Sequence, residues 1–177
     1  MSRIREFNSE RILKASCLEF AEKGYAATKI MDIAKKVDLP KPNIYYYFQS
    51  KEKLYRCVLE SIIEPLLEAS ASFEIYDEPA IALEQYIRTK IRISQQHPHA
   101  SKVFSSEIMH GAPHLTQDIT DKLMQQTRQM TSRIEQWIAD EKMHPVDPQH
   151  LQILIGKLLK SQGKKHSKLR IIKQLPT

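Results

Sequence analysis

Glycine and cysteine are scarce in this chain, whose 177 residues include four glycines and two cysteines. Cys17 and Cys57 are too few and too far apart for a disulfide framework or a metal motif, and each falls where a helix would bury a small side chain. Alternating β-rich runs are also missing from the sequence. These absences predict an all-α protein and fit a reducing cytoplasm.

Long apolar runs and catalytic motifs are absent as well. No stretch approaches the length of about 18 uncharged apolar residues that a membrane span needs, and the charged start MSRIREFNSER has no apolar export segment. The sequence contains no P-loop, dinucleotide fingerprint, G-x-S-x-G or H-E-x-x-H. We therefore expect a cytoplasmic protein that is not an enzyme.

The seven histidines raise the question of a metal site. His110 and His114 have the i, i+4 spacing that aligns two ligands on a helix, but Gly111 and Pro113 interrupt that helix. Solvated or loop histidines are the better interpretation. We expect no metal and no cofactor.

Charge is distributed unevenly along the chain. Residues 1–56 carry a net charge of +5, residues 57–155 carry −6 and residues 156–177 carry +7, which together give the overall +6. A basic head joined to an acidic body is typical of a DNA-binding domain attached to an effector and dimerisation domain, because only the head must neutralise phosphates. We take these three ranges as the domain organisation, the last one being a basic tail.

Within the head, two short helices joined by a tight turn are predicted between residues 28 and 48. Apolar residues recur at i, i+3, i+4 and i+7 from residue 30, and the hydroxyl of Thr28 can cap this helix. The pattern breaks at Asp38, one of the few residues besides glycine that tolerates a positive φ. Pro40 and Pro42 are then expected in the first turn of the second helix.

The second helix has an unusual outer face. Ile44 and Phe48 share its inner side, and the outer and flanking positions carry no carboxylate. These positions suit the major groove: asparagine pairs with adenine, lysine with guanine or phosphate, and tyrosine with phosphate or a thymine methyl group. The candidate DNA-contacting residues are Lys41, Asn43, Tyr45, Tyr46 and Tyr47. The alternative is that the three tyrosines only pack a helix corner.

Two flanking helices complete the head. Residues 8–23 form the first, which Gly24 ends, and residues 1–7 supply two arginines that either reach DNA or belong to a disordered terminus. Ser50 can cap a further helix that begins at Lys51. The N–H groups of that helix and the Lys51 ammonium would together bind a DNA phosphate.

From these residues a resemblance follows. The run at 12–59, ILKASCLEFAEKGYAATKIMDIAKKVDLPKPNIYYYFQSKEKLYRCVL, resembles the DNA-binding domain of the tetracycline-repressor (TetR) family of bacterial transcription regulators. Asp38 stands where the family usually has glycine, and Pro42 where it often has glycine or a small polar residue. The resemblance implies a homodimeric repressor of a palindromic operator in double-stranded DNA, with Thr28 and Lys51 on phosphates.

The body is predicted to be a helical bundle that encloses either a plain core or a ligand cavity. Apolar patterns indicate helices after Pro79, at 99–110 with Ile108 inward and at 116–142, and Asp147 should cap one more helix. Pro65 should kink or end the helix that enters the body. Residues 97–115 and 145–155 resemble TetR-family regulators of pyrimidine utilisation, which implies uracil or thymine as effector, but no set of ligand-binding residues carries over.

That resemblance stops at Ile155, and the remaining sequence GKLLKSQGKKHSKLRIIKQLPT is basic and contains no acid. We expect either an altered frame or truncation that replaced the dimer helices, or a genuine basic tail with non-specific phosphate affinity. The sequence as a whole therefore predicts a ligand-responsive, operator-binding regulator. The alternative is a helical protein-interaction module, or a regulator that acts only by heterodimerising with an intact relative.

Overall fold

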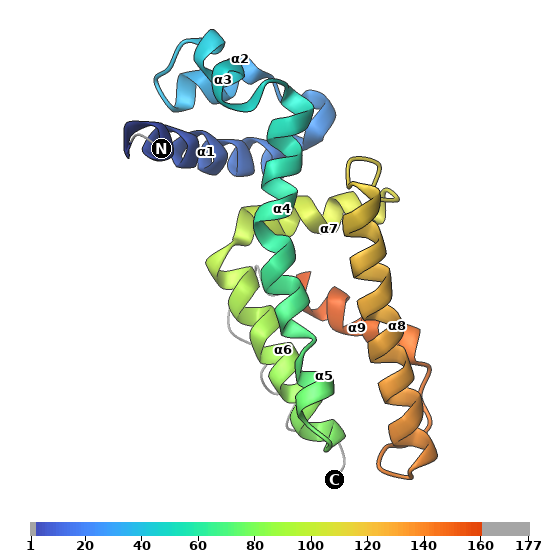
Figure 1. Ribbon diagram of the computed structural model, residues 1–177. Helices are drawn as coiled ribbons and strands as arrows, with labels where there is room; N and C mark the ends of the chain where they lie inside the picture. The colour runs from blue at the N-terminus through green and yellow to red at the C-terminus, as the bar shows by residue number, and fades with distance from the viewer. Residues whose placement is uncertain (1–2, 161–177) are drawn as a thin grey trace.

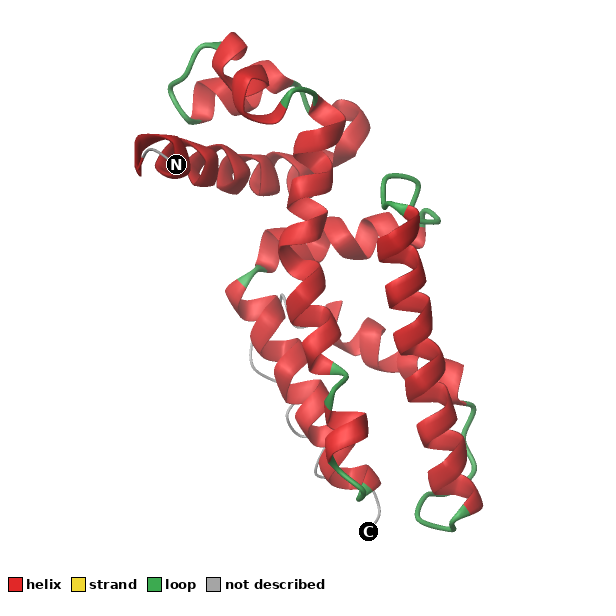
Figure 2. Cartoon of the chain, in the orientation of Figure 1, coloured by secondary structure: helices red, strands yellow, loops and turns green. Residues whose placement is uncertain are grey.

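The computed structural model describes residues 3–160, and every regular element in this range is an α-helix (Figures 1 and 2). The predicted all-α fold is confirmed. None of the helices in the described range is long and apolar enough to cross a membrane. In chain order the helices are α1 (Arg3–Ala27), α2 (Ile30–Lys36), α3 (Lys41–Phe48), α4 (Lys51–Ala69), α5 (Ser72–Ile75), α6 (Pro79–Gln96), α7 (Pro98–Met109), α8 (Gln117–Ala139) and α9 (Pro148–Lys160).

The head consists of α1, α2, α3 and the first turns of α4, packed around one apolar core (Figure 1). Ile12, Ile33 and Leu54 are fully buried there and come from three different helices. Helix α1 begins five residues earlier than the predicted residue 8. Its regular helix breaks at Gly24, where φ is +76°, a value that glycine adopts without steric cost.

Helix α4 belongs to the head and to the body. Val58 and Leu59 lie in the head core, whereas Ile62, less than one turn further on, lies in the body core. The helix continues through Pro65 to Ala69, so the proline does not end it. The division predicted after residue 56 falls inside this helix, which runs from the head into the body (Figure 1).

In the body, α6 lies alongside α4, α7 crosses beneath the head, and α8 forms the opposite side with α9 packed against it (Figure 1). Trp137 and Ile134 of α8 are fully buried in the body core. The sequence did not predict the short helix α5, and Ile108 is 46% exposed rather than inward because it lies on the outer face near the end of α7.

The predicted helix caps have different outcomes. The Ser50 hydroxyl accepts a hydrogen bond from the backbone N–H of Lys53 at 3.0 Å, and the Asp147 carboxylate caps α9 through the N–H groups of two residues. Both predictions are confirmed. The prediction for Thr28 is wrong, because Lys29 is the N-cap of α2 and no side chain caps that helix.

Candidate nucleic-acid interface

A tight turn joins α2 to α3. Asp38 has a φ of +51°, and the N–H of Leu39 donates to the Ala34 carbonyl at 3.1 Å. The residue that the sequence singled out therefore adopts the left-handed conformation. Pro40 is the N-cap of α3 rather than a first-turn residue, and Pro42 lies in the first turn, where its missing N–H breaks no helical bond.

Helix α3 turns one face inward and one outward. Ile44 and Phe48 are buried in the head core. Lys41, Pro42 and Asn43, which form the first turn, are all exposed. The outward face carries no acidic side chain, so it presents a cation, an amide and aromatic rings to whatever approaches it.

The three successive tyrosines do not share one environment. Tyr46 is 68% exposed and Tyr45 is exposed with the Lys41 ammonium 5.7 Å from its ring centroid. Tyr47 is partly buried, and its hydroxyl accepts a hydrogen bond from the amide of Asn8 at 3.2 Å. The corner-packing interpretation thus describes Tyr47, while Tyr45 and Tyr46 remain free to contact a ligand.

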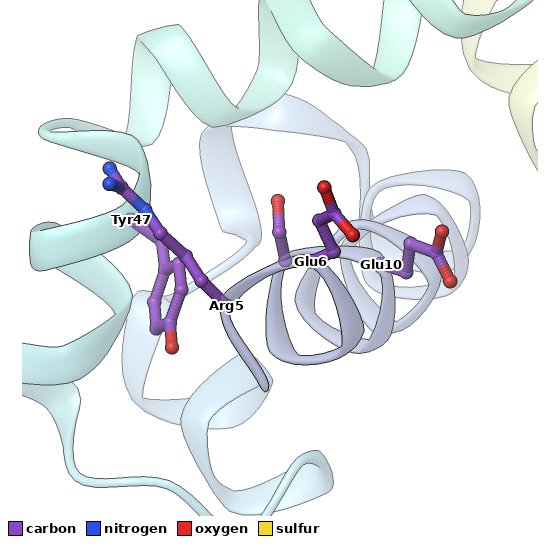
Figure 3. Close-up of a pocket in the computed structure, with 5 residues that line it drawn as sticks. Arg5, Glu6, Glu10 and Tyr47 are labelled. Carbon is purple, nitrogen blue, oxygen red and sulfur yellow. The ribbon is translucent and has the colours of Figure 1, made fainter. Parts of the chain in front are cut away.

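The first turns of α1 lie beside α3. Figure 3 shows Arg5 extending next to Tyr47, with Glu6 and Glu10 along α1. These residues line a hollow of about 280 Å³. The Arg5 guanidinium also lies 5.7 Å from the ring centroid of Tyr46. The expectation of a disordered terminus is wrong from Arg3 onward, where the chain is already helical, and a contact of these arginines with DNA stays a prediction. Sequence spacing gave no signal for these contacts, because they join residues about 40 positions apart.

Lys51 and Thr28 were predicted to bind phosphates. The Lys51 ammonium donates to the Ala26 carbonyl at 3.3 Å and lies 4.6 Å from the centroid of the Tyr25 ring, and burial lowers its pKa. The Thr28 side chain is only 1% exposed, and its hydroxyl donates to the backbone carbonyls of Glu19 and Gly24. Thr28 therefore holds α1 to the start of α2, and its hydroxyl cannot reach a phosphate in this conformation.

A buried carboxylate supports the same junction. Glu19 is 2% exposed and forms ion pairs with Lys23 at 2.7 Å and Lys36 at 2.8 Å. Burial by itself would raise the pKa of Glu19, but the hydrogen bonds and charges of the two lysines outweigh it and lower this pKa. Glu19 thus ties α1 to α2, a role that its position in the helical pattern did not indicate.

A second buried carboxylate joins the head to the body. Glu107 of α7 is 3% exposed and accepts a hydrogen bond from the Tyr55 hydroxyl of α4 at 3.0 Å. It also accepts the backbone N–H of His114 at 2.6 Å and faces the His114 imidazole at 3.2 Å. Of the two alternatives for His114, solvated or in a loop, the second is confirmed, because the residue lies between α7 and α8 with its ring packed against Tyr25 and Tyr55.

Together these features define a class of protein. Two short helices cross through a tight turn, the second helix exposes a polar and aromatic face without acids, and the head is joined by one continuous helix to an all-helical body. This is the architecture of a helix-turn-helix DNA-binding transcription regulator.

Comparison with known proteins defines the family. Residues 12–58 match the family of bacterial regulatory proteins named tetR, and residues 59–161 match the C-terminal region of YcdC-like proteins. The chain belongs to the TetR family of transcription regulators, as the sequence indicated. The second match extends six residues beyond Ile155, where the resemblance seen in the sequence ended; residues 161–177 lie outside the described part of the structure.

Individual relatives agree with this assignment. The HTH-type transcriptional regulator RutR of Escherichia coli K12 is 34% identical over 154 residues, which cover 87% of this chain and 73% of RutR. The structure of the TetR-family regulator PfmR from Thermus thermophilus has a TM-score of 0.75 at 17% identity, covering 92% and 93% of the two chains. A structure of AibR with isovaleryl coenzyme A and operator DNA has a TM-score of 0.73 at 18% identity, covering 94% of each chain.

Proposed function

We propose that this regulator is a ligand-responsive repressor that binds a palindromic operator through α2 and α3. The observation that carries this proposal is the outer face of α3. It combines exposed Lys41 and Asn43 in the first turn, where a recognition helix meets base edges, with Tyr46 alongside. An inward-facing or acidic surface at these positions would not suit DNA.

Contacts to the DNA backbone would flank this face. The N-terminus of α4 offers free backbone N–H groups, and Lys51 stands at its first position. The Lys51 ammonium donates one of its three N–H groups to the Ala26 carbonyl, so the other two can bind a DNA phosphate without a movement of the side chain. Tyr45 and Tyr47 lie at the edges of the recognition face, and Thr28 is left out of the interface.

Operator binding as a dimer requires a self-complementary surface on the body. We assign this surface to α8 and α9, where the apolar side chains of Met124, Ile153 and Leu154 are exposed. For the effector, the resemblance to pyrimidine-utilisation regulators favours uracil or thymine. Effector binding would act through α7, which packs against both α1 and α4, and would change the spacing of the two heads.

The test begins with selection of a binding sequence from a randomised duplex library, followed by fluorescence anisotropy with the selected and a scrambled duplex. Asn43→Ala should weaken binding to the selected duplex about 10-fold or more and leave the scrambled duplex unaffected. Lys51→Ala should weaken both and reduce the salt dependence. Gln125→Ala, an exposed amide on α8, is the matched control and should change neither.

Two results would count against the proposal: a selection that yields no preferred duplex, or an Asn43→Ala variant that binds the selected duplex as tightly as the unmodified protein. Salt-insensitive association, or none, would instead favour the alternative of a protein-interaction module. Light scattering over a concentration series should give the mass of a dimer; a monomer at all concentrations would refute the dimeric part.

A further inference from the structure

The turn between α7 and α8 lies against the head. It covers residues 110–116, and its backbone has two positive φ values, +85° at Gly111 and +58° at Ala112. The N–H of Ala112 donates to the Glu107 carbonyl at 2.9 Å, so the chain reverses tightly at the end of α7. Leu115, three residues further on, packs against the head core. A segment that leads into the body helix α8 therefore contacts the head directly.

Glu107 fixes His114, which lies in this turn. The carboxylate accepts a hydrogen bond from the His114 backbone N–H at 2.6 Å, and one of its oxygens lies 3.2 Å from Nδ1 of the imidazole. The same carboxylate accepts the Tyr55 hydroxyl at 3.0 Å. One side chain that is only 3% exposed thus holds both the backbone and the ring of His114. The position of the imidazole is set by α7.

The imidazole packs on Tyr25, the residue after the glycine at which α1 breaks. The two ring centroids are 4.2 Å apart, and the ring planes are tilted by 51°. The Tyr25 ring also contacts Tyr55 at 4.8 Å and Phe20 at 6.2 Å between centroids. Three rings therefore surround the Tyr25 ring, and the nearest of them, His114, is held by α7.

Lys51 lies on this same tyrosine. Its ammonium is 4.6 Å from the centroid of the Tyr25 ring, within the range of a cation–π interaction. Its hydrogen bond to the Ala26 carbonyl at 3.3 Å is a second anchor, on the residue next to Tyr25. Packing here removes solvent from the ammonium and lowers the pKa of Lys51. The place of the Tyr25 ring thus determines where the charge of Lys51 lies.

We propose that His114 is a positioning residue for the phosphate contact of Lys51 and that it acts through Tyr25. Glu107 fixes the imidazole, the imidazole fixes the Tyr25 ring, and the ring holds the ammonium at the N-terminus of α4. This inference deepens the proposed function, since it rests on Lys51 binding a DNA phosphate. These side-chain contacts connect body and head separately from the backbone of α4. A displacement of the turn between α7 and α8 therefore changes the affinity for DNA.

A double-mutant cycle between His114 and Lys51 tests this proposal. Binding of the full-length protein to the selected duplex and to a scrambled duplex is followed by fluorescence anisotropy at one fixed salt concentration. His114→Gln removes the ring and keeps a hydrogen-bond donor toward Glu107, whereas His114→Phe keeps a flat ring against Tyr25. His110→Gln, at the exposed histidine that begins the same turn, is the matched control. Each change is made in the wild type and in Lys51→Ala.

His114→Gln should weaken binding to both duplexes by about 2- to 5-fold, because a phosphate contact is independent of sequence. His114→Phe and His110→Gln should bind as the wild type does. In the Lys51→Ala background, His114→Gln should have no further effect, whereas a residue that only stabilises the fold would weaken binding in both backgrounds. Three results would overturn the proposal: equal losses in the two backgrounds, a loss confined to the selected duplex, or unchanged binding by His114→Gln.

A second measurement contains no DNA. An NMR titration gives the pKa of Lys51, whose resonances are identified by their absence from the Lys51→Ala spectrum. Loss of the packing in His114→Gln should raise this pKa toward its ordinary value, and His110→Gln should leave it unchanged. An unchanged pKa in His114→Gln would contradict the positioning role.

Failure of this proposal differs from failure of the proposed function. If no operator can be selected, the proposed function fails, and the cycle can still be measured on the scrambled duplex. If Lys51→Ala leaves binding to both duplexes unchanged, Lys51 binds no phosphate and the positioning role falls with it, while Asn43→Ala still tests base reading. Operator binding that depends on Lys51 but not on His114 counts against the positioning role alone.

Discussion

The hydrogen bond between Tyr55 and Glu107 should contribute measurably to stability, since it joins α4 to α7 in a buried position. Tyr55→Phe removes the hydroxyl and leaves the ring in place. A hydrogen bond to a charged group contributes about 1.5–3 kcal/mol net. The carboxylate keeps the His114 N–H at 2.6 Å and faces the imidazole, so it is not left without partners. We therefore expect a loss of about 2 kcal/mol.

Urea denaturation followed by circular dichroism measures this loss, with thermal unfolding as a second assay. For a protein of this size, about 2 kcal/mol corresponds to a decrease in Tm of roughly 4–8 °C. Tyr45→Phe is the control, because the exposed Tyr45 hydroxyl makes no hydrogen bond within residues 3–160. A double-mutant cycle with Glu107→Gln isolates the pairwise interaction from other effects of each change.

Two outcomes would refute this reasoning. If Tyr55→Phe loses no more stability than Tyr45→Phe, the hydrogen bond between Tyr55 and Glu107 is no more favourable than the hydrogen bonds that the two groups make to water in the unfolded chain. If both single variants are destabilised but the cycle shows no coupling between Tyr55 and Glu107, each residue acts through other neighbours. In that case the pair would not be the contact that holds α7 to α4.

Three further changes test other parts of the structure by urea denaturation. Ser50→Ala should cost about 1 kcal/mol because the Lys53 N–H loses its acceptor, and an unchanged midpoint would show that water replaces the cap. Asp38→Gly should gain about 0.5 kcal/mol by relieving the positive φ, and a loss would mean that the side chain contributes to the turn. Lys90→Met should be more stable than wild type at pH 7. Burial lowers the pKa of Lys90 from 10.5 to about 8, so between these pH values the unfolded chain still holds a proton that the folded chain has lost. Raising the pH across this interval should therefore increase the stability of the wild type relative to Lys90→Met by on the order of 3 kcal/mol. A stability difference that does not change with pH would contradict the lowered pKa.

Local features of the sequence predicted the helices well. Capping residues such as Ser50 and Asp147, and the left-handed Asp38, depend on a few neighbouring positions, so their chemistry can be read directly from the chain. The inward positions of α3 follow in the same way from the helical period. The division of α3 into a buried and an exposed face was therefore predictable before any coordinates.

Contacts between distant segments were not predictable in this way. Glu107, Glu19 and Asn8 look like ordinary polar positions in a helical pattern, and their importance depends on partners that packing brings to them. Thr28 shows the reverse case: its residue type and place fit a helix cap, but the tertiary structure buries it against α1. Periodicity gives the buried face of a helix and not the identity of what lies against it.

Helix α4 has a mechanical consequence for regulation. Its 19 residues span about 28 Å without a loop between the two cores, so one continuous helix connects the body to the head. A tilt of about 10° at the lower end would displace the upper end by about 5 Å, which is more than the rise of about 3.4 Å between base pairs. In the dimeric operator complex that we propose, a small change in the packing of the body would therefore shift each α3 out of register with its half-site.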